Sequence, residues 1–588
     1  MASLIEPASR ILDVHDQELG SGVRSVGLLL IKPSHYDDDG FVIQWWRSFM
    51  ISNVLIVVDG LFAEAADRWA LGPDIRIETR RIDEMSNRLR PDELMRWLDG
   101  FDRCAVMMVG VQTNQFPRAV DIARPFREAG YPVIIGGFHV SGVLAMVPEW
   151  EGAFPGVKEL GISLFAGELE AGVDALLRDI RDGAVKPLYN NLTQVADLSK
   201  APALIAAPDV AARTLDNFHG MEVGRGCPFI CSFCTIINVH GHAMRCRSPE
   251  AIETYLRGVA AVGGHSILIS DDNFARSPIW REVTEILIRL SRELDWEWDV
   301  LVQVDTLASR IPGFVEACRE AGVKRIFLGM ESVREDNLKA AAKGQNKLHL
   351  MRDMVLTWKR AGIMIYAGVI IGFPNDTPER VREDIRFLQD EIPVDIVTFF
   401  ALSPLPGSKD HQLMLRGGVP IDEDLNAFDT IHVITDHPLM TRTEWQALFQ
   451  ESWRQYYTLR HMWTVVGRGL YYGLSMKNLC STFAAGYGSA VIEGVHPLDY
   501  GAIRQYDAPS RRPGYPALPR PVHEVRYTAK SLLGAASALM LVYIAFAMAG
   551  ILSLARPFGL LKRFSLDDRV AAPVPGAAVE PAQQTAAE

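Results

Sequence analysis

The chain has 588 residues, 48% of them hydrophobic, and a formal net charge of −12 at pH 7. Its length predicts two or three domains, and its hydrophobic content is sufficient for a buried core in each of them. The acidic balance argues against nucleic acid as a partner, because phosphate binding requires concentrated Lys and Arg side chains.

The seven cysteines show no disulfide-like spacing, which favours a reducing compartment. The N-terminal extension 1–22 is polar and mixed in charge, without the apolar core of a signal peptide. We therefore expect the body of the protein to lie in the cytoplasm.

Residues 23–185 predict a first domain with a doubly wound α/β fold, because short apolar runs alternate with helical stretches. The expected strands are 25–31, 54–58, 105–111 and 132–135, and the expected helices include 91–98 and 118–129. Ligands of such sheets bind at the carboxyl ends of the strands. The candidate ligand-binding residues near those ends are Ser34, His35, Gly110, Gln112, Gly136, Gly137 and His139.

The paired glycines Gly136 and Gly137 directly follow an expected strand, where the missing side chains let a flat ligand approach the backbone. A tight turn between strand and helix, with nothing bound, explains the same pair equally well. After this domain, residues 186–219 predict a connector, with a stretch rich in Ala and Pro at 201–208.

Three cysteines, Cys227, Cys231 and Cys234, lie within eight residues near the start of a second domain, 220–420. Thiolates are the usual ligands of a [4Fe–4S] cluster, and three of them leave one iron open to a small molecule. Zinc is an alternative, since His240 or His242 could complete a tetrahedral site, and unligated thiols are another. No second Cys pair follows in the sequence, which favours the cluster.

The second domain continues the alternation of strands and helices and predicts six β/α units. Catalytic groups of such folds lie at the carboxyl ends of the strands. The expected strands are 221–223, 266–269, 298–303, 325–328, 364–371 and 396–402. The expected helices are 249–261, 281–293, 311–321, 348–361 and 378–390.

The spacing Cys-x3-Cys-x2-Cys, with Phe233 before the last cysteine, resembles the signature of the radical S-adenosylmethionine (SAM) enzymes. The resemblance implies a partial (β/α)6 TIM-type barrel whose three cysteines, as the catalytic centre, hold a [4Fe–4S] cluster. It also implies that SAM binds the open iron and is cleaved reductively to a 5′-deoxyadenosyl radical. The residues that the resemblance places near SAM are Phe233, Asp271, Asp272, Glu331, Ser332, Gly372 and Pro374.

Some of these residues also have simpler explanations. The neighbouring carboxylates Asp271 and Asp272 are suited to orient SAM or a polar group of the substrate, although a solvated turn explains them too. Glu331 suits a charge-assisted hydrogen bond to SAM. Pro374 and the glycines before it are also typical of turns. The segment Lys343–Asn346 is similar to the family as well, but the sequence suggests no role for it.

Joined to this core, the first domain resembles the cobalamin-binding Rossmann-like domain of one radical SAM subgroup. Gly136, Gly137 and His139 match its Gly-Gly-x-His, and Gly167 and Glu168 match a later Gly-Glu. The resemblance implies that these residues contact cobalamin, together with Ser34, His35, Gly110 and Gln112. The spacing around His35 departs from the Asp-x-His-x-x-Gly pattern of cobalt ligands, which favours a loop histidine.

Residues 421–525 predict a helical C-terminal region and a Pro-rich linker, with one long amphipathic helix over 441–461. Its aromatic residues are expected in the core, with a substrate wall as the alternative. Residues 526–557 predict a transmembrane helix, because 531–555 is uncharged and long enough to cross a bilayer. A buried core helix is the alternative. The tail 558–588 is expected to be disordered, and the helix to anchor the cytoplasmic body to the inner membrane.

The resemblance implies a cobalamin-dependent radical SAM enzyme that methylates an unactivated carbon of a small molecule such as a lipid, isoprenoid or tetrapyrrole. It also implies a low-potential electron donor such as flavodoxin or ferredoxin. One alternative keeps the radical chemistry but ends in cyclisation or rearrangement. Another is a non-catalytic, membrane-tethered cobalamin or Fe–S sensor, against which Glu331 and Ser332 argue, because a sensor needs no SAM site.

Overall fold

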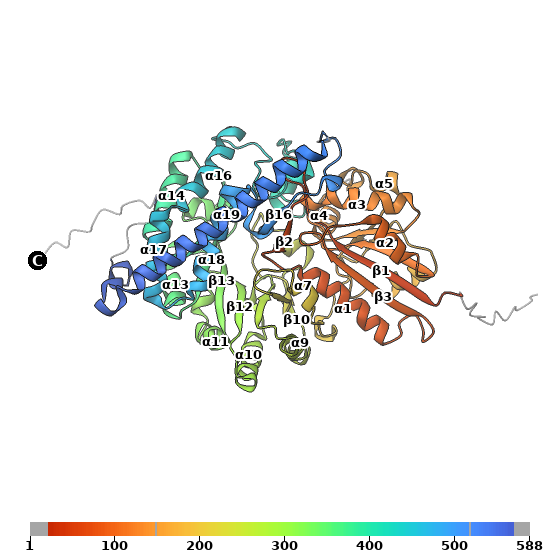
Figure 1. Cartoon of the computed structure of the whole chain (residues 1–588), viewed down its shortest axis with the longest axis horizontal. Helices are drawn as coiled ribbons and strands as arrows, with labels where there is room; N and C mark the ends of the chain where they lie inside the picture. The colour runs from red at the N-terminus through yellow and green to blue at the C-terminus, as the bar shows by residue number, and fades with distance from the viewer. Residues whose placement is uncertain (1–21, 148–149, 517–518, 568, 570–574, 576–588) are drawn as a thin grey trace, which may run out of the picture.

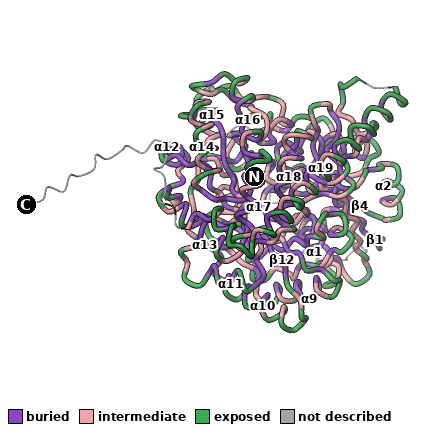
Figure 2. Tube along the Cα trace, turned by 60° about the vertical axis from the view of Figure 1, so that its left-hand side comes forward, coloured by how far each residue is buried: buried purple, intermediate pink, exposed green. Residues whose placement is uncertain are grey.

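The structure is a computed structural model that describes residues 22–147, 150–516, 519–567, 569 and 575 (Figure 1). Two six-stranded parallel sheets lie side by side, and helices of the C-terminal region cover the second one. Buried residues run through the interior of both, whereas outer helices such as α9 (Pro249–Ala261), α10 (Trp280–Leu294) and α11 (Phe314–Glu320) carry many exposed residues (Figure 2). The N-terminal extension and most of the tail 558–588 fall outside the described residues. The expected disorder is wrong for the start of the tail, because Leu560–Phe564 forms a short helical turn and Arg352 donates to the carbonyl of Leu566.

The first sheet has the strand order β3-β1-β4-β5-β6-β7, and each of its neighbouring pairs is parallel. Strand β1 (Ser25–Lys32), next to the edge strand β3, is fully buried along its apolar run, as expected for a strand covered on both faces. The sheet extends to Asn190, five residues beyond the expected domain end. Its other elements are β3 (Arg76–Asp83), β4 (Arg103–Met108), β5 (Val133–Gly136), β6 (Ser163–Ala166), β7 (Leu188–Asn190), α2 (Pro91–Leu98), α3 (Phe116–Glu128), α4 (Phe138–Met146), α5 (Val157–Leu160), α6 (Val173–Arg181) and α7 (Pro208–Ala211).

The strand expected at 54–58 is wrong, because these residues belong to helix α1 (Asn53–Asp67). The helix contacts β1 and β3 of the first sheet and also β8 of the second. It is therefore buried along the whole run from Leu55 to Phe62, without the polar face that gives a helix its periodicity. Such a run cannot be distinguished from a buried strand by its sequence pattern.

The second sheet has the sequential parallel order β8-β11-β12-β13-β14-β15, with the six strands expected for the six β/α units. The strands are β8 (His219–Met221), β11 (Ser266–Ile269), β12 (Asp299–Val304), β13 (Val323–Glu331), β14 (Met364–Ile371) and β15 (Ile396–Ala401). The helices are α9 (Pro249–Ala261), α10 (Trp280–Leu294), α11 (Phe314–Glu320), α12 (Glu335–Ala340), α13 (Leu348–Arg360), α14 (Pro378–Asp390) and α15 (Lys409–Arg416). The short elements β9 (Gly224–Arg225), α8 (Ile236–Val239) and β10 (Arg245–Cys246) lie between β8 and α9.

The single long helix expected over 441–461 is wrong, because the chain forms α16 (Arg442–Tyr456) and α17 (Leu459–Tyr472). Thr458 begins the second helix by accepting a hydrogen bond from the N–H of His461 (3.1 Å). The aromatic residues are core, as predicted: Trp445 donates to the carbonyl of Ile371 (3.1 Å), at the end of β14. Helix α18 (Met476–Tyr487) follows.

The last part of the chain returns to the first domain. Strand β16 (Gly501–Gln505) pairs antiparallel with β2 (Gln44–Ser48). The expected linker is packed as well, since Arg512 forms an ion pair with Asp424 and Arg511 donates to the carbonyl of Asp39.

Helix α19 (Arg520–Ser553) is long and apolar enough to cross a membrane, and it covers most of the expected transmembrane segment. It runs along α17, α18 and β16 rather than away from the body (Figure 1). One face of the helix is therefore packed, and Ala545 and Leu552 on that face are buried.

Candidate active site

Two carboxylates at the end of β11 hold the segment around the cysteine loop. Asp271 accepts a hydrogen bond from the N–H of Val223 (2.7 Å), and Asp272 accepts one from the N–H of Gly226 (2.7 Å). Asp272 also contacts Nδ1 of His240 (3.1 Å), beyond the last cysteine. Burial raises the pKa of Asp271 well above its ordinary value. The two carboxylates fix this segment, and their contact with SAM stays a prediction.

Cys227, Cys231 and Cys234 lie in the loop between β9 and β10 and are partly buried. Burial raises the pKa of Cys227 and raises that of Cys234 to about 11, so these thiols stay protonated at neutral pH when nothing is bound. Thiolates therefore require a compensating positive charge, which bound iron supplies.

Among the described residues, no group of three or more His, Cys, Asp or Glu side chains converges on one metal-ion position. Tetrahedral zinc requires such convergence, and His240 contacts Asp272 rather than a thiol. A [4Fe–4S] cluster takes each thiolate on a separate iron, so its ligands need not meet at one point. The assignment of Cys227, Cys231 and Cys234 as ligands of a [4Fe–4S] cluster stays a prediction.

Glu331 ends β13 in a left-handed backbone conformation, with φ 63°, at a bulge in the pairing with β14. Few non-glycine residues adopt this conformation, and strain of this kind concentrates at functional sites. Residue Glu331 is 8% exposed, and its carboxylate forms an ion pair with Nζ of Lys343. That ammonium lies 5.7 Å from the ring centre of Phe233. Glu331, Lys343 and Phe233 thus form one group beside the last cysteine.

The segment Lys343–Asn346 links the cysteine loop to the end of β13. Burial lowers the pKa of Lys343, but Glu331 and the Cys231 sulfur more than offset this and raise it. Gln345 donates a hydrogen bond to Sγ of Cys231 (3.5 Å). Asn346 donates to the carbonyl of Met330 (2.8 Å), next to Glu331. The segment therefore presents an amide donor to Cys231 and a buried cation to Cys231 and Cys234.

Three other predicted SAM residues have structural contacts of their own. Ser332 Oγ accepts a hydrogen bond from Asn337 at the start of α12 (3.2 Å). Gly372 has φ 109°, and a side chain there would overlap the ring of Trp445. Pro374 is exposed in the turn after β14. Contact of these three residues with SAM stays a prediction.

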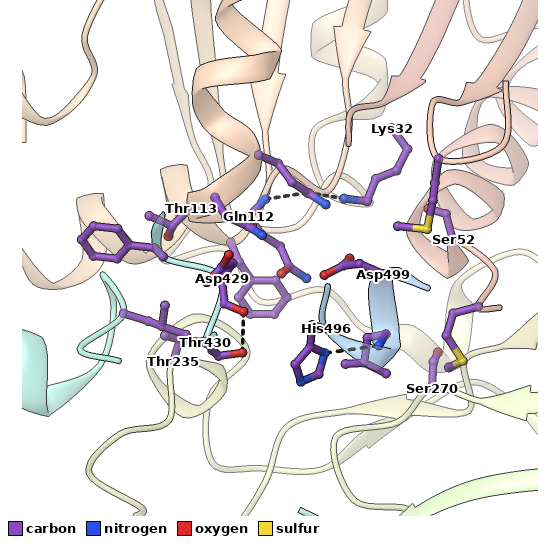
Figure 3. Close-up of a pocket in the computed structure, with 18 of the residues that line it drawn as sticks. Lys32, Ser52, Gln112, Thr113, Thr235, Ser270, Asp429, Thr430, His496 and Asp499 are labelled. Atoms are coloured by element: carbon purple, nitrogen blue, oxygen red, sulfur yellow. Dashed lines mark hydrogen bonds between the residues drawn. The ribbon is translucent and has the colours of Figure 1, made fainter. Parts of the chain in front are cut away.

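A cavity of about 520 Å³, here called the junction cavity, lies where the two sheets and the C-terminal region meet (Figure 3). It also reaches Thr235, directly after the third cysteine. Its lining includes Lys32, Ser52 and Gln112 from the first domain, Ser270 and Gln303 from the second, and His496 from the C-terminal region.

Two charged groups of the first domain lie in this lining. Burial lowers the pKa of Lys32 to about 8, and its ammonium donates to the carbonyl of Gly110 (3.1 Å). Burial raises the pKa of Asp83 to about 6. The first domain therefore brings groups that titrate near neutral pH to the junction cavity.

A second cavity of about 450 Å³, here called the α1 cavity, adjoins the first and shares Lys32, Gln112 and Asp272 with it. Apolar side chains of α1, among them Val54 and Leu61, form much of its lining. Six of the predicted cobalamin residues line it, namely Gly110, Gln112, Gly136, Gly137, Gly167 and Glu168. The structure thus brings these six together at the carboxyl ends of the strands.

The other three predicted cobalamin residues, Ser34, His35 and His139, are not part of the lining of either cavity. Ser34 Oγ donates to the carbonyl of Ile43 (2.7 Å). His139 packs against Phe116, and burial lowers its pKa to about 3. His35 is buried in the loop after β1, in line with its interpretation as a loop histidine.

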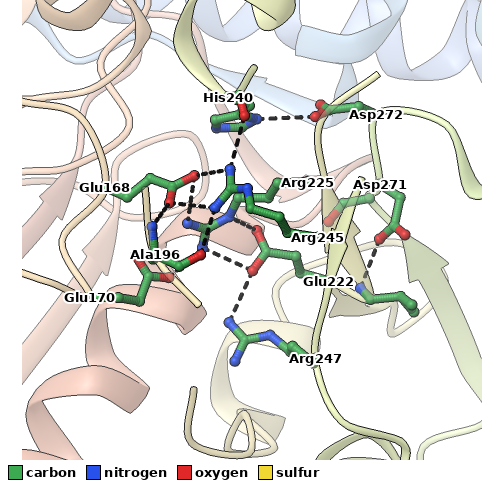
Figure 4. A network of polar contacts seen from close by, with 12 residues as sticks. Glu168, Glu170, Ala196, Glu222, Arg225, His240, Arg245, Arg247, Asp271 and Asp272 are labelled. Carbon is green, nitrogen blue, oxygen red and sulfur yellow. Dashed lines mark hydrogen bonds and ion pairs between the residues drawn. The ribbon is translucent and has the colours of Figure 1, made fainter. Parts of the chain in front are cut away.

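An ionic network joins the first domain to the two strands that flank the cysteine loop (Figure 4). Arg245 of β10 donates to both carboxylate oxygens of Glu168 (2.8 and 2.7 Å). Arg225 of β9 donates to Glu222 (2.7 Å) and to Glu170 (2.6 Å). Burial raises the pKa of Glu168, but Arg245 and Arg225 outweigh it and lower the pKa. The Glu168 carboxylate is therefore engaged in ion pairs with arginines of the second domain.

The sequence comparisons agree with this geometry. Residues 221–388, which include the cysteine loop and Glu331, match the family model described as the radical SAM superfamily. Residues 221–388 are therefore a radical SAM domain. The radical SAM domain thus begins at the end of β8 and reaches α14.

A bacteriochlorophyllide d C-8(2)-methyltransferase of Chlorobaculum tepidum is 24% identical over 394 residues, 64% of this chain and 83% of the relative. A hopanoid C-2 methylase of Rhodopseudomonas palustris is 25% identical over 381 residues, 64% of this chain and 66% of the relative. The structure of OxsB, a cobalamin-dependent S-adenosylmethionine radical enzyme solved with aqua-cobalamin and S-adenosylmethionine, aligns with TM-score 0.55 and 13% identity. That alignment covers 93% of this chain and 82% of OxsB, and at this identity it shows a shared fold.

These comparisons confirm the prediction of a radical SAM enzyme and support a [4Fe–4S] cluster, SAM and cobalamin as its cofactors. Sequence reasoning missed two groups of the site. The segment Lys343–Asn346 is similar to the family in sequence, but its contact with Cys231 joins residues 114 positions apart and therefore leaves no local sequence pattern. His496 lies outside the radical SAM domain, in a region where no motif pointed to the cavity.

Proposed function

We propose that the protein is a cobalamin-dependent radical SAM methylase that transfers a methyl group to an unactivated carbon of a small molecule. The junction cavity carries this proposal, because Gln112 of the first domain and Gln303 of the radical SAM domain line the same space. When bound, the cluster and SAM supply hydrogen-atom abstraction, and cobalamin supplies the methyl group. A substrate held between the two domains is positioned for both steps.

In the radical SAM domain, the three cysteines hold the cluster in this proposal. Glu331 is buried and close to the loop, which suits it to accept hydrogen bonds from the amino or hydroxyl groups of SAM. Lys343 forms an ion pair with this carboxylate and brings a positive charge to the thiolates. Gln345 positions Cys231 through its amide.

In the first domain, the α1 cavity suits a flat and largely apolar part of cobalamin. Gly137 supports this role, because its φ of 146° and its approach to the backbone of Val111 exclude a side chain. Glu168 binds arginines of the radical SAM domain, so it holds the two domains together rather than offering a free charge to the cofactor. His35 lines neither cavity, which argues against cobalt ligation by this residue.

The apolar part of the junction cavity, with Phe400, Leu405 and Phe428, supports a largely apolar substrate. A lipid, an isoprenoid or a tetrapyrrole meets this requirement, and two relatives are named for a hopanoid and a bacteriochlorophyllide. A flavodoxin or ferredoxin supplies the electrons in this scheme. Cyclisation or rearrangement is the competing outcome of the same chemistry.

The proposal is tested anaerobically with the full chain, reconstituted with iron and sulfide, supplied with hydroxocobalamin, reduced and mixed with SAM. We expect bound cobalamin together with release of 5′-deoxyadenosine, and S-adenosylhomocysteine once substrate is present. Deoxyadenosine without bound cobalamin would contradict the role of the first domain. Product without S-adenosylhomocysteine would identify a cyclase or rearrangement enzyme. Bound cobalamin without any SAM cleavage would indicate a sensor.

We also propose that α19 attaches the enzyme to a membrane by lying along the bilayer surface. Its outer face is apolar and exposed, with Leu533 at 69% and Tyr543 at 68% exposure, whereas its other face packs on the body. Residues 520–563 carry six Lys or Arg residues against one acid, Glu524, in a chain with net charge −12. An apolar face bordered by basic residues fits an anionic lipid surface.

Flotation of the full chain with vesicles of phosphatidylglycerol and phosphatidylcholine tests this attachment. The double variant L533S/Y543S should lose binding, whereas L413S, an exposed leucine on α15, serves as the matched control. Equal flotation of all three proteins would overturn the proposal. Natural membranes washed with alkaline carbonate should release the protein. Retention after that wash would mean that α19 crosses the bilayer, as the sequence alone suggested.

A further inference from the structure

His496 places a buried, unpartnered polar atom at the junction cavity. The side chain is 3% exposed, and its Nε2 atom has no hydrogen-bond partner among the described residues. The residue lines the cavity, and its ring packs against Phe400 near the end of β15, 4.8 Å between ring centres (Figure 3). Because an unpaired buried donor costs free energy, such an atom indicates a partner that enters the cavity.

The local backbone determines which ring nitrogen carries the proton. Nδ1 accepts a hydrogen bond from the N–H of Leu498 (3.2 Å), so His496 caps the short helical turn Pro497–Asp499. An accepting Nδ1 is unprotonated, and the proton of the neutral imidazole is therefore on Nε2. Burial lowers the pKa of His496, which keeps the ring neutral at pH 7. The cavity thus receives a fixed N–H donor.

The surroundings of this donor define what it can bind. The carboxylate of Asp499 faces the same space and is an acceptor (Figure 3). Phe400, Phe428 and Leu498 supply apolar surface around the two polar groups. Lys32 and Asp429 also belong to the lining, and Asp499 and Asp429 both act electrostatically on His496. The His496 donor together with the Asp499 acceptor matches a hydroxyl group, which both accepts and donates.

We propose that His496 and Asp499 form a recognition site for a hydroxyl group on an otherwise apolar substrate. This inference rests on the proposed function, in which the junction cavity holds the substrate. Nε2 of His496 donates to the hydroxyl oxygen, and the Asp499 carboxylate accepts the hydroxyl proton. Both residues lie outside 221–388, so this specificity site belongs to the C-terminal region rather than to the matched radical SAM domain.

Two variants separate recognition from the capping role of His496. In H496N, the amide oxygen still caps the turn, but the side chain ends short of the position of Nε2. In H496Q, an amide N–H reaches toward that position, but the cap is weakened. Recognition therefore predicts that H496Q retains binding better than H496N, and a purely structural role predicts the reverse order.

The test is equilibrium dialysis of the cluster- and cobalamin-loaded full chain with 2-naphthol and with naphthalene, which differ by one hydroxyl group. We expect wild type to bind 2-naphthol about tenfold more tightly, the value for one hydrogen bond of about 1.4 kcal/mol. H496N should lose this preference, and H496Q should keep part of it. Equal binding of the two probes by wild type, no binding of either, or an unchanged preference in H496N would overturn the proposal. Binding needs no SAM cleavage, so the deoxyadenosine assay judges the proposed function separately.

Discussion

Replacing Glu331 by Gln removes one charge from the site while keeping the size of the side chain. Gln also keeps a Cβ at the left-handed position, so the backbone strain at φ 63° is the same in both proteins. The change therefore isolates the carboxylate. It affects both the ion pair with Lys343 and the proposed hydrogen bonds to SAM.

The burial of Glu331 and Lys343 sets the expected losses in SAM affinity and in stability. The side chains of Glu331 and Lys343 are 11% and 10% exposed, so solvent screens their interaction little. A hydrogen bond to a charged group contributes about 1.5–3 kcal/mol, which corresponds to a loss of about 10- to 150-fold in SAM affinity. Breaking a buried ion pair costs about 3–5 kcal/mol, and this is an upper bound here because Gln still accepts a hydrogen bond from Lys343.

The assay is anaerobic binding of SAM to the reconstituted protein, with iron content and thermal stability measured on the same samples. A matched control exists at the opposite end of the sheet, where Lys359 and Asp395 form a fully buried ion pair. D395N should lower stability without changing SAM affinity. E331Q should lower SAM affinity with iron content unchanged.

Two outcomes would contradict the role of Glu331 in SAM binding. If E331Q bound SAM as tightly as wild type while losing stability as D395N does, Glu331 would be a structural partner of Lys343. If E331Q lost iron together with SAM, its primary role would be to support the cysteine loop rather than to bind SAM.

Two further predictions concern contacts between domains. His432 bonds to Asp38 and Asp429, which raise its pKa to about 10. Protonation of His432 therefore stabilises the folded protein. This contribution to the free energy of unfolding is complete below pH ~6.5, the pKa of an unfolded histidine, and is lost as the pH rises through 10. The melting temperature of H432Q should therefore fall less than that of wild type between pH 7 and 10, and equal slopes would contradict this. E168A removes the buried partner of Arg245 and should destabilise domain docking by about 3 kcal/mol. Faster proteolysis within 186–219 and lower cobalamin occupancy would show that the two domains dock less stably. Wild-type behaviour in both measurements would contradict the role of Glu168 in holding the domains together.

The parts of the fold that the sequence predicted best are strongly patterned. The bounds of β11, β14, α9 and α14 agree to the residue, and both helices begin at a proline. Strand β3, Arg76–Asp83, was missed because its residues are mostly charged, as an edge strand allows. Helix α1 was misread because it packs between strands of both sheets, which buries its apolar run from Leu55 to Phe62.

The candidate site also contains residues that short sequence motifs predict and contacts that they do not. The cysteines and Glu331 were predicted because they stand in short, dense patterns. The contact between Gln345 and Cys231, and the position of His496 at the cavity, depend on how distant elements pack. Sequence patterns report spacing along the chain, whereas these contacts are set by the fold as a whole.

The pairing of β2 with β16 has a consequence for the order in which the molecule folds during synthesis. The indole N–H of Trp45 donates to the carbonyl of Asp499, which is 454 residues later in the chain. A ribosome adds about 5–20 residues per second, so the wait between the two is roughly 20–90 s. During that time β2 has no partner strand, and Trp45, only 1% exposed in the finished protein, is uncovered. The nascent first domain therefore presents an unpaired edge and an apolar side chain, which makes this interval the point where chaperone binding protects the chain from aggregation.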